Sequence, residues 1–422
     1  MHSPNPVEAQ ITRLIREDWG RLLSVLTGFG GDLTLAEDCL QDAVVAALQA
    51  WPEAGVPKAP DAWLITTARR KAIDRLRRTQ TNERNADALA LWHWQNAPEA
   101  EELQTLPDRR LELIFTCCHP ALDEKSQVAL TLRVVGGLTT GEIAAAFLDK
   151  QEAMAARLTR AKKKIAAAGI RFRLPEAEDL PGRIAGILQV IYLIFNEGHR
   201  GSSDQLTRTD LAEEAIRLMR IMSTCLPDHL ETKGLLALML LTDARRLARK
   251  GPSGAFIPLE EQNRSRWDRG KIREGKLLVE QVLTASPPGP YTLQAAISAL
   301  HAEAPDFAST DWLQIVALYD LLWKQQPNPV VLVNCAVAQS YATDPATALD
   351  QLEATGAGEH LQAYQPYHAC RADLLARQGR SQEAITAYSL AIELTEAPEE
   401  AVFLQKRRNA VASIVSSDQT SS

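Results

Sequence analysis

Residues 137–165 read GLTTGEIAAAFLDKQEAMAARLTRAKKKI, and this stretch predicts two short helices that meet at a turn. Thr139 and Glu142 are spaced as a capping box, in which the first side chain accepts from a free N–H of the opening turn and the acid reaches back. Asp149 and Glu152 repeat this spacing. One helix is therefore expected to begin just after each of the two boxes.

Two helices so short and so close cannot lie antiparallel, so they are expected to cross steeply as a helix-turn-helix. The first helix is expected to end near Phe147, with Ile143, Ala144 and Phe147 facing inward. On the second helix, apolar residues at four, three and four spacing predict a buried stripe, formed by Met154, Leu158, Ala161 and Ile165.

The outer face of the second helix is basic, and a helix presented in this way fits the DNA major groove. We expect Gln151 and Arg157 to reach base edges. The remaining basic side chains are expected to hold phosphates, namely Arg160, Lys162, Lys163 and Lys164. A solvated helix hairpin with basic decoration is the alternative interpretation.

Two basic patches interrupt an acidic chain. The 422 residues carry a net charge of −7, yet residues 69–84 hold seven Arg or Lys against two acids, and residues 157–173 hold seven against none. Basic residues also decorate solvated helix faces. Two such patches, each on a recognisable helix, favour contact with a nucleic acid at defined places.

The composition limits the class of protein. The length suggests two to four domains, and a hydrophobic fraction of 45% is ample for packed cores. The start, MHSPNPVEAQ, lacks the basic and apolar runs of a signal peptide, and no stretch reaches about 18 uninterrupted apolar residues. Six cysteines without a C-x-x-C pair favour reduced thiols, so we expect a cytoplasmic chain without membrane contact.

The whole chain is expected to be all-α, because apolar residues recur at three and four spacing and strand signals are almost absent. The prolines of PPGP (287–290) and PNP (327–329) are expected to interrupt its longer, C-terminal part. The predicted segments are a first helical block at 7–80, a linker at 81–102, a second block at 103–173, a helical extension at 174–412 and a tail at 413–422.

A repeat is visible near the end of the extension, in HACRADLLARQGRSQEAITAYSLAIEL (368–394). Small residues and one aromatic have the spacing of a tetratricopeptide (TPR) helix pair, at Ala372, Gly379, Ala384, Tyr388 and Ala391. Small residues allow two antiparallel helices to approach closely. A weaker copy, in which Ala348 stands 36 residues before Ala384, favours a TPR-like helical repeat.

The first block contains the other basic patch. In PDAWLITTARRKAIDRLRR (60–78) basic residues surround apolar ones, and in AEDCLQDAVVAALQAW (36–51) the two kinds of residue lie on separate faces. The predicted apolar stripe of the latter consists of Leu40, Val44, Leu48 and Trp51. The other face carries Glu37, Asp38, Gln41 and Asp42.

These stretches together resemble bacterial RNA polymerase sigma factors of the extracytoplasmic-function (ECF) type. Residues 36–51 look like the region 2.2 helix, residues 63–78 like regions 2.3 and 2.4, and residues 137–165 like region 4.2, in the same order and with a short linker. LPDRRLELIFTCCHPALDEKSQVALTLRVVGG (106–137) fits region 4.1. The resemblance implies a region 2 helical bundle, a region 4 helix-turn-helix and a role in transcription initiation.

The resemblance also implies site residues. The polymerase β′ clamp coiled coil would receive Asp38, Gln41 and Asp42, and region 4 would meet the β flap. The loop 52–60 would capture a base of the −10 element. The helix that follows this loop would lie along the duplex upstream of the −10 element, and it carries Arg70, Asp74, Arg77 and Arg78. The linker, with Trp92 and Trp94, would run toward the RNA exit path, and the helix near Lys150 would read the −35 element.

The extension is similar to that of a sigma-factor subgroup with a long TPR-like C-terminal part. IYLIFNEGH (191–199), LEEQNRSRWDRGKI (259–272), GPYTLQAAISALHAEA (289–304) and STDWLQIVALYDLL (309–322) carry this likeness. The chain departs from the subgroup at Asn263, where Asp is usual, and at His199, where Tyr is usual. A regulatory protein or ligand is expected to act on the extension.

Other residues suggest chemistry but do not complete a site. In CCHP (117–120) adjacent helical cysteines point about 100° apart and cannot easily share one metal ion, so a buried helix end is favoured. FNEGHRG pairs Glu197 with His199 without a partner cluster, which suggests a helix-ending turn or a small-ligand pocket. We therefore expect no metal, no cofactor and no enzymatic activity.

Three alternatives remain at this point. A one-component helix-turn-helix regulator with a TPR-like sensor domain would bind DNA but would not need core polymerase. An enzyme within residues 174–420 would need an acid–base or metal set that the sequence does not contain. A pure TPR scaffold would leave residues 7–172 unexplained.

Overall fold

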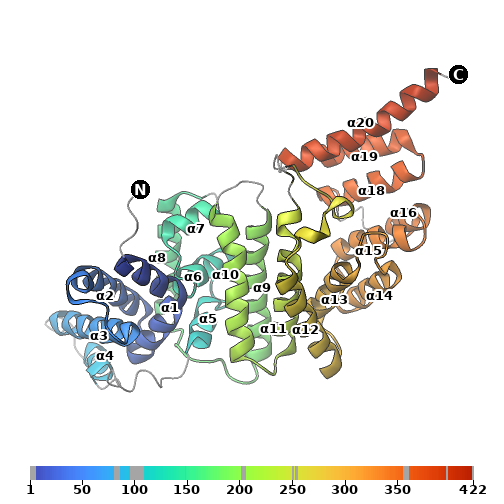
Figure 1. The fold of residues 1–422 in the computed structure, drawn as a ribbon. Helices are drawn as coiled ribbons and strands as arrows, with labels where there is room; N and C mark the ends of the chain where they lie inside the picture. Colours follow the sequence, from blue (N-terminus) through green and yellow to red (C-terminus); the bar gives the residue numbers. More distant parts are fainter. Residues whose placement is uncertain are drawn as a thin grey trace. The chain divides into compact units, whose positions relative to one another are not determined.

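The computed structural model describes residues 6–79, 86–95, 109–147, 149–200, 206–249, 251, 255–354, 361–395 and 398–420. Within these ranges the regular elements are helices, which confirms the all-α prediction (Figure 1). The chain divides into two compact units. The first comprises Met1–His199 and Gln205–Cys225, and the second comprises Arg200–Asp204 and Leu226–Ser422.

The first block folds as a helical bundle in which α1, α2 and α3 pack on one another, and the short α4 packs on α1 and α3. Its helices are α1 (Pro6–Gly30), α2 (Leu33–Ala54), α3 (Pro60–Thr79) and α4 (Ala86–Gln95). Asp32 caps α2 by accepting from the backbone N–H groups of Thr34 and Leu35.

The apolar face of α2 differs in part from the predicted stripe. Leu40 and Trp51 are buried as expected, but Val44 is only half-buried and Leu48 is 43% exposed. Small residues take the inner positions instead, at Ala36, Ala43 and Ala47. A helix face lined with alanine lets its neighbours approach closely, so the larger side chains lie at its rim.

The second block supplies four helices, and α1 packs against the first two of them. They are α5 (Arg110–Cys117), α6 (Glu124–Val134), α7 (Thr140–Ala146) and α8 (Gln151–Ala167). α8 packs on α6 and α7. The helices of both blocks therefore share one compact unit.

Two helices of the predicted extension also belong to this first unit: α9 (Leu180–Arg200) and α10 (Leu206–Cys225). The Arg183 guanidinium donates to the carbonyl oxygen of Phe115 at 2.7 Å, and Arg217 donates to that of Val135 at 3.1 Å. α10 also packs on α5 and α7. These contacts attach the start of the extension to the second block.

The second unit continues as helices in chain order. These are α11 (Leu230–Asp243), α12 (Arg269–Ala285), α13 (Pro290–Glu303), α14 (Trp312–Gln325), α15 (Pro329–Ala342), α16 (Pro345–Ala354), α18 (Gln365–Arg377), α19 (Ser381–Glu393) and α20 (Pro398–Thr420), with short 3-10 turns η2 (Arg246–Ala248), η3 (Leu259–Glu261) and η4 (Arg264–Arg266) between α11 and α12. The two proline interruptions fall where predicted, because α13 and α15 begin at Pro290 and Pro329.

The predicted repeat positions are buried where α18 and α19 pack together. Ala372, Ala384 and Ala391 are fully buried, and so is Ala348 of the weaker copy. Gly379, with φ of +75°, turns the chain between the two helices, a conformation that favours glycine. α20 continues to Thr420, so its last turns lie in the segment expected to be a tail.

Among the described residues, none of the helices combines the length and the apolar character that a membrane crossing requires.

Candidate nucleic-acid and polymerase interface

The turn before α7 contains the first predicted capping box. The Thr139 hydroxyl accepts from the backbone N–H of Glu142 at 3.2 Å, and the Glu142 carboxylate accepts from the Thr139 N–H at 2.7 Å. The second predicted box is wrong. α8 begins at Gln151 with Lys150 at its N-cap, and the Asp149 carboxylate accepts from the adjacent Lys150 N–H instead of capping the helix. Asp149 lies one residue too early to cap the helix.

The buried face of α8 agrees with the prediction. Its four buried residues are Met154, Leu158, Ala161 and Ile165. Because this stripe faces α6 and α7, the opposite face of α8 is presented outward. Gln151, Arg160, Lys163 and Lys164 are exposed on it, which is the placement that contact with DNA requires.

Arg157 and Lys162 differ from the other predicted DNA-contacting residues because each faces a carboxylate. The Arg157 guanidinium lies 3.7 Å from Asp149, and its side chain is 26% exposed. Its buried Nε has no hydrogen-bond partner among the described residues. The Lys162 ammonium binds the carboxylate of Glu37 on α2.

Glu37 is the central residue of a buried ion cluster. Only 2% of its side chain is exposed. Arg133 on α6 donates from Nε to Glu37 Oε1 at 2.7 Å, and Lys162 on α8 donates to Oε2. Gln41, one helical turn further along α2, donates to Oε1 at 3.2 Å. We call Glu37, Arg133 and Lys162 the interblock clasp, since one carboxylate of the first block holds two cations of the second.

The acidic residues predicted to meet the polymerase lie side by side on α2. Asp38 and Asp42 both accept from the guanidinium of Arg75 on α3, at 3.3 Å and 2.6 Å. Their side chains remain 51% and 41% exposed. Two carboxylates facing one cation leave this surface acidic and accessible, and Gln41 is exposed beside them.

The residues predicted to face the −10 element lie together on α3. Arg70, Asp74, Arg77 and Arg78 are all exposed there. The predicted base-capturing loop 52–60 is shorter in the structure, because α2 continues to Ala54 and α3 begins at Pro60; Gly55, with φ of +81°, caps α2. Trp51 and Trp63 pack edge to face at its base, with ring centroids 5.4 Å apart. The loop therefore starts from a rigid aromatic anchor.

The described part of the predicted linker is ordered. Trp94 of α4 is fully buried, with its ring 5.7 Å from that of Phe29. Arg69 donates to the carbonyl oxygens of Trp94 and Gln95 at 2.8 Å and 2.6 Å. Trp94 thus completes the core of the first block and does not run toward another molecule, whereas Trp92 is 57% exposed. Residues 96–102 lie outside the described ranges.

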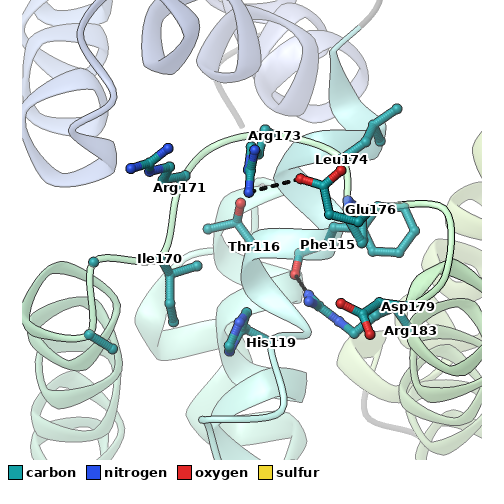
Figure 2. A pocket seen from close by; sticks show the side chains of 13 residues that line it. Phe115, Thr116, His119, Ile170, Arg171, Arg173, Leu174, Glu176, Asp179 and Arg183 are labelled. Carbon is teal, nitrogen blue, oxygen red and sulfur yellow. Dashed lines mark hydrogen bonds and ion pairs between the residues drawn. The ribbon is translucent and has the colours of Figure 1, made fainter.

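A pocket of about 310 Å³ lies where the second block meets α9 (Figure 2). Arg183 reaches into its wall and donates to Phe115, and burial lowers the pKa of its guanidinium. Arg173 pairs with Glu176 at 3.1 Å on the rim. The Arg183 bond joins α9 to α5, a contact that the sequence patterns did not indicate.

The cysteines and histidine of CCHP have structural contacts. Cys117 and Cys118 are buried at the end of α5, as predicted, and Cys118 Sγ lies 3.4 Å from the Thr131 hydroxyl. Burial raises the pKa of Cys118 to about 12. His119 accepts from the Ala121 N–H. In the ranges that the structure describes, no group of His, Cys, Asp and Glu residues could hold a metal ion.

The fold and these surfaces define a protein with the two promoter-recognition domains of sigma factors. Residues 14–82 match the model of sigma-70 region 2, and residues 112–165 match that of sigma-70 region 4. Residues 183–283 match a family of unknown function, DUF6596. Sigma-factor domains are not enzymatic, which agrees with the prediction that this chain is not an enzyme.

A relative matches this chain over nearly its whole length. The chain is 40% identical over 396 residues to "Uncharacterized protein R00370" of Rhizobium meliloti (strain 1021), and the match covers 92% of this chain and 93% of the relative. The chain belongs to the same family, with sigma-70 regions 2 and 4 followed by a helical extension. No solved structure matches it.

Proposed function

We propose that this chain is an ECF-type sigma factor that binds core RNA polymerase, recognises −10 and −35 promoter elements and initiates transcription under the control of its C-terminal extension. It acts where the polymerase acts, in the cytoplasm. The observation that carries the proposal is the combination of sigma-70 regions 2 and 4 with an outward basic helix α8.

The polymerase contact is proposed at the acidic surface of α2. Asp38, Gln41 and Asp42 are accessible together, and Arg75 neutralises the two carboxylates in part. A clamp coiled coil with basic residues would find a complementary surface there. Region 4 is proposed to meet the β flap.

The two DNA contacts are proposed on different helices. α3 offers Arg70, Asp74, Arg77 and Arg78 beside the loop 52–60, where unstacked bases of the −10 element would be held. α8 offers its first turns to the −35 major groove, with Gln151 and Arg157 at base edges and the lysines on phosphates.

The interblock clasp would have to open in this process. The two promoter elements lie roughly 25 base pairs apart, or roughly 85 Å at 3.4 Å per base pair. Glu37 and Lys162 are in direct contact, so regions 2 and 4 could not reach both elements while this ion pair persists. We infer that the free chain is closed and that assembly with polymerase and promoter separates the two regions.

The extension is proposed to be a TPR-like regulatory domain. Small buried residues at Ala372, Ala384 and Ala391 support a helical repeat, whose surfaces generally bind peptides or proteins. Its first helices, α9 and α10, contact region 4 directly. A ligand or partner of the extension could thus alter how region 4 is held.

Run-off transcription tests the proposal. Purified full-length chain is added to core polymerase with genomic promoter fragments, and defined transcripts are expected. The matched control is the Asp38→Arg, Asp42→Arg variant, which should fail with the same templates. If the chain binds these fragments as tightly without core polymerase as with it, and no transcript forms, the chain is a one-component regulator.

A further inference from the structure

The second unit contains an aromatic groove formed by helices far apart in the sequence. A pocket of about 320 Å³ is lined from α14, α15, α18, α19 and α20. The rings of Trp312 and Tyr341 stack 4.8 Å apart, and Phe307 meets both edge to face. The aromatic side chains of this groove are Phe307, Trp312, Tyr319, Tyr341, Tyr388 and Phe403.

A short segment of the chain lies on this groove. Residues 256–261, which we call the strap, belong to the yellow segment between α11 and α12 in Figure 1. The Phe256 ring packs edge to face on Phe403 of α20, with centroids 5.5 Å apart. Pro258, Leu259 and Glu260 line the pocket. The strap thus occupies one side of a groove that remains hollow beneath it.

The acidic residue of the strap is held by two groups of the groove. Arg407 of α20 forms an ion pair with the Glu260 carboxylate, and the Tyr341 hydroxyl donates to the same carboxylate at 3.4 Å. Arg377, which lies 4.5 Å from the centre of the Tyr341 ring, faces Asp373 at 3.6 Å. Arg377 therefore pairs with a carboxylate of the groove itself, Asp373, whereas Arg407 pairs with Glu260 of the strap.

The strap has the form of a bound peptide. Pro258, with φ of −66° and ψ of 158°, has the polyproline II conformation, and one 3-10 turn follows at Leu259–Glu261. Proline fixes this conformation in advance and so lowers the entropy lost on binding. Phe256 and Leu259 are only half-buried, so the strap can leave the groove without exposing a fully buried side chain of its own.

We propose that this groove is a peptide-binding site and that the strap occupies the place of a partner protein's segment. The partner segment would have an aromatic residue, a proline and an acidic residue at every second position, the spacing of Phe256, Pro258 and Glu260 in the strap. Replacement of one such segment by another requires no change in the helices. This inference concerns the extension alone and does not depend on promoter recognition.

A displacement experiment tests it with a fluorescein-labelled peptide of residues 255–262, AFIPLEEQ. The full-length Phe256→Ala, Glu260→Ala variant, in which the strap has lost both anchors, is expected to bind this peptide at least tenfold more tightly than wild type. The matched control peptide has alanine in place of its phenylalanine and first glutamate, and it should bind neither protein.

Substitutions in the groove identify the site. Added to the strap variant, Arg407→Glu should abolish binding of the peptide, and a peptide with lysine in place of its first glutamate should restore it. Tyr341→Phe, which removes only a hydroxyl, should weaken binding of the peptide severalfold. This variant replaces Arg407→Glu in the test if the circular dichroism spectrum shows that Arg407→Glu disturbs the fold. Failure of the strap variant to bind, or binding that ignores both groove substitutions, would overturn the proposal.

Discussion

Glu37 on α2 and Lys162 on α8 form an ion pair although 125 residues separate them in the sequence. Arg133 binds the other oxygen of the same carboxylate at 2.7 Å, and Glu37 is almost fully buried. A buried carboxylate is stable only when it is paired, so the clasp holds regions 2 and 4 together through one side chain. It also engages Lys162, one of the residues proposed to contact DNA.

Glu37→Gln is expected to loosen this junction, since it retains the shape of the side chain and removes its charge. The free full-length chain should then bind a −35 duplex about tenfold more tightly, which corresponds to about 1.4 kcal/mol. Two effects contribute: Lys162 becomes available to phosphates, and the closed form loses stability. Fluorescence anisotropy at one fixed salt concentration measures the change.

Glu53→Gln provides the matched control, because it removes the same charge from an exposed position of the same helix. Its affinity for the duplex should stay within about twofold of wild type, as expected for an exposed charge in screening salt. If Glu37→Gln and Glu53→Gln behave alike, the clasp does not restrain the recognition helix.

Reversal of the acidic surface on α2 is expected to block polymerase binding. Asp38→Arg with Asp42→Arg should lower the affinity for core enzyme at least tenfold, because complementary charges become like charges. Arg75→Ala is the comparison variant. It removes the intramolecular ion-pair partner of both carboxylates, so its affinity for core enzyme should equal or exceed that of wild type. Co-purification measures binding, and unchanged recovery of the reversed variant would refute the assignment.

Alanine substitutions of Arg157 and Lys163 are expected to change DNA binding in different ways. Arg157→Ala should cost about 1–3 kcal/mol and relax the preference at one base position, because a bidentate base contact is lost. Lys163→Ala should weaken binding evenly across sequences and reduce the salt slope by about 1. Titration of duplexes with single base changes separates the two, and an intact base preference in Arg157→Ala would mean that another residue reads that base.

The pattern of residues 137–165 was sufficient to predict the helix-turn-helix, because its signals can be read along the sequence itself. The capping box acts within the first turn of α7, and the four-residue apolar stripe recurs along about three turns of α8. The same reasoning failed at Asp149, where a one-residue shift in the start of α8 removed the cap. Helix ends depend on the packing of neighbours as well as on the residues that stand there.

Glu37 shows why the clasp could not be predicted. It was grouped with the surface acids Asp38 and Asp42, although its position between Leu33 and Leu40 places it on the apolar face of α2. That position indicates burial, but only the fold shows which cations lie opposite. Arg133 and Lys162 are 96 and 125 residues away, and helical periodicity carries no information about such pairs.

Truncation at residue 225 is expected to give a stable protein, and truncation at residue 175 a less stable one. The shorter chain loses α9 and α10, and with them the bonds of Arg183 to Phe115 and of Arg217 to Val135. Each kcal/mol lost should lower the midpoint of thermal unfolding by about 2–4 °C in a chain of this size. Calorimetry of both fragments measures this, and equal midpoints would show that the two helices do not support region 4.

His301 is expected to make the stability of the second unit depend on pH. Burial, together with Arg245 and Arg264, lowers its pKa from 6.5 to about 4. Between these two pH values the unfolded chain binds a proton at His301 and the folded chain does not. The free energy of unfolding is therefore at its full value above pH 6.5 and decreases by about 2–3 kcal/mol toward pH 4 because of this residue. Denaturant unfolding at pH 7.5 and pH 5 measures the loss. His301→Gln removes the titrating group and should flatten this part of the profile, and an unchanged slope would assign the effect to other residues.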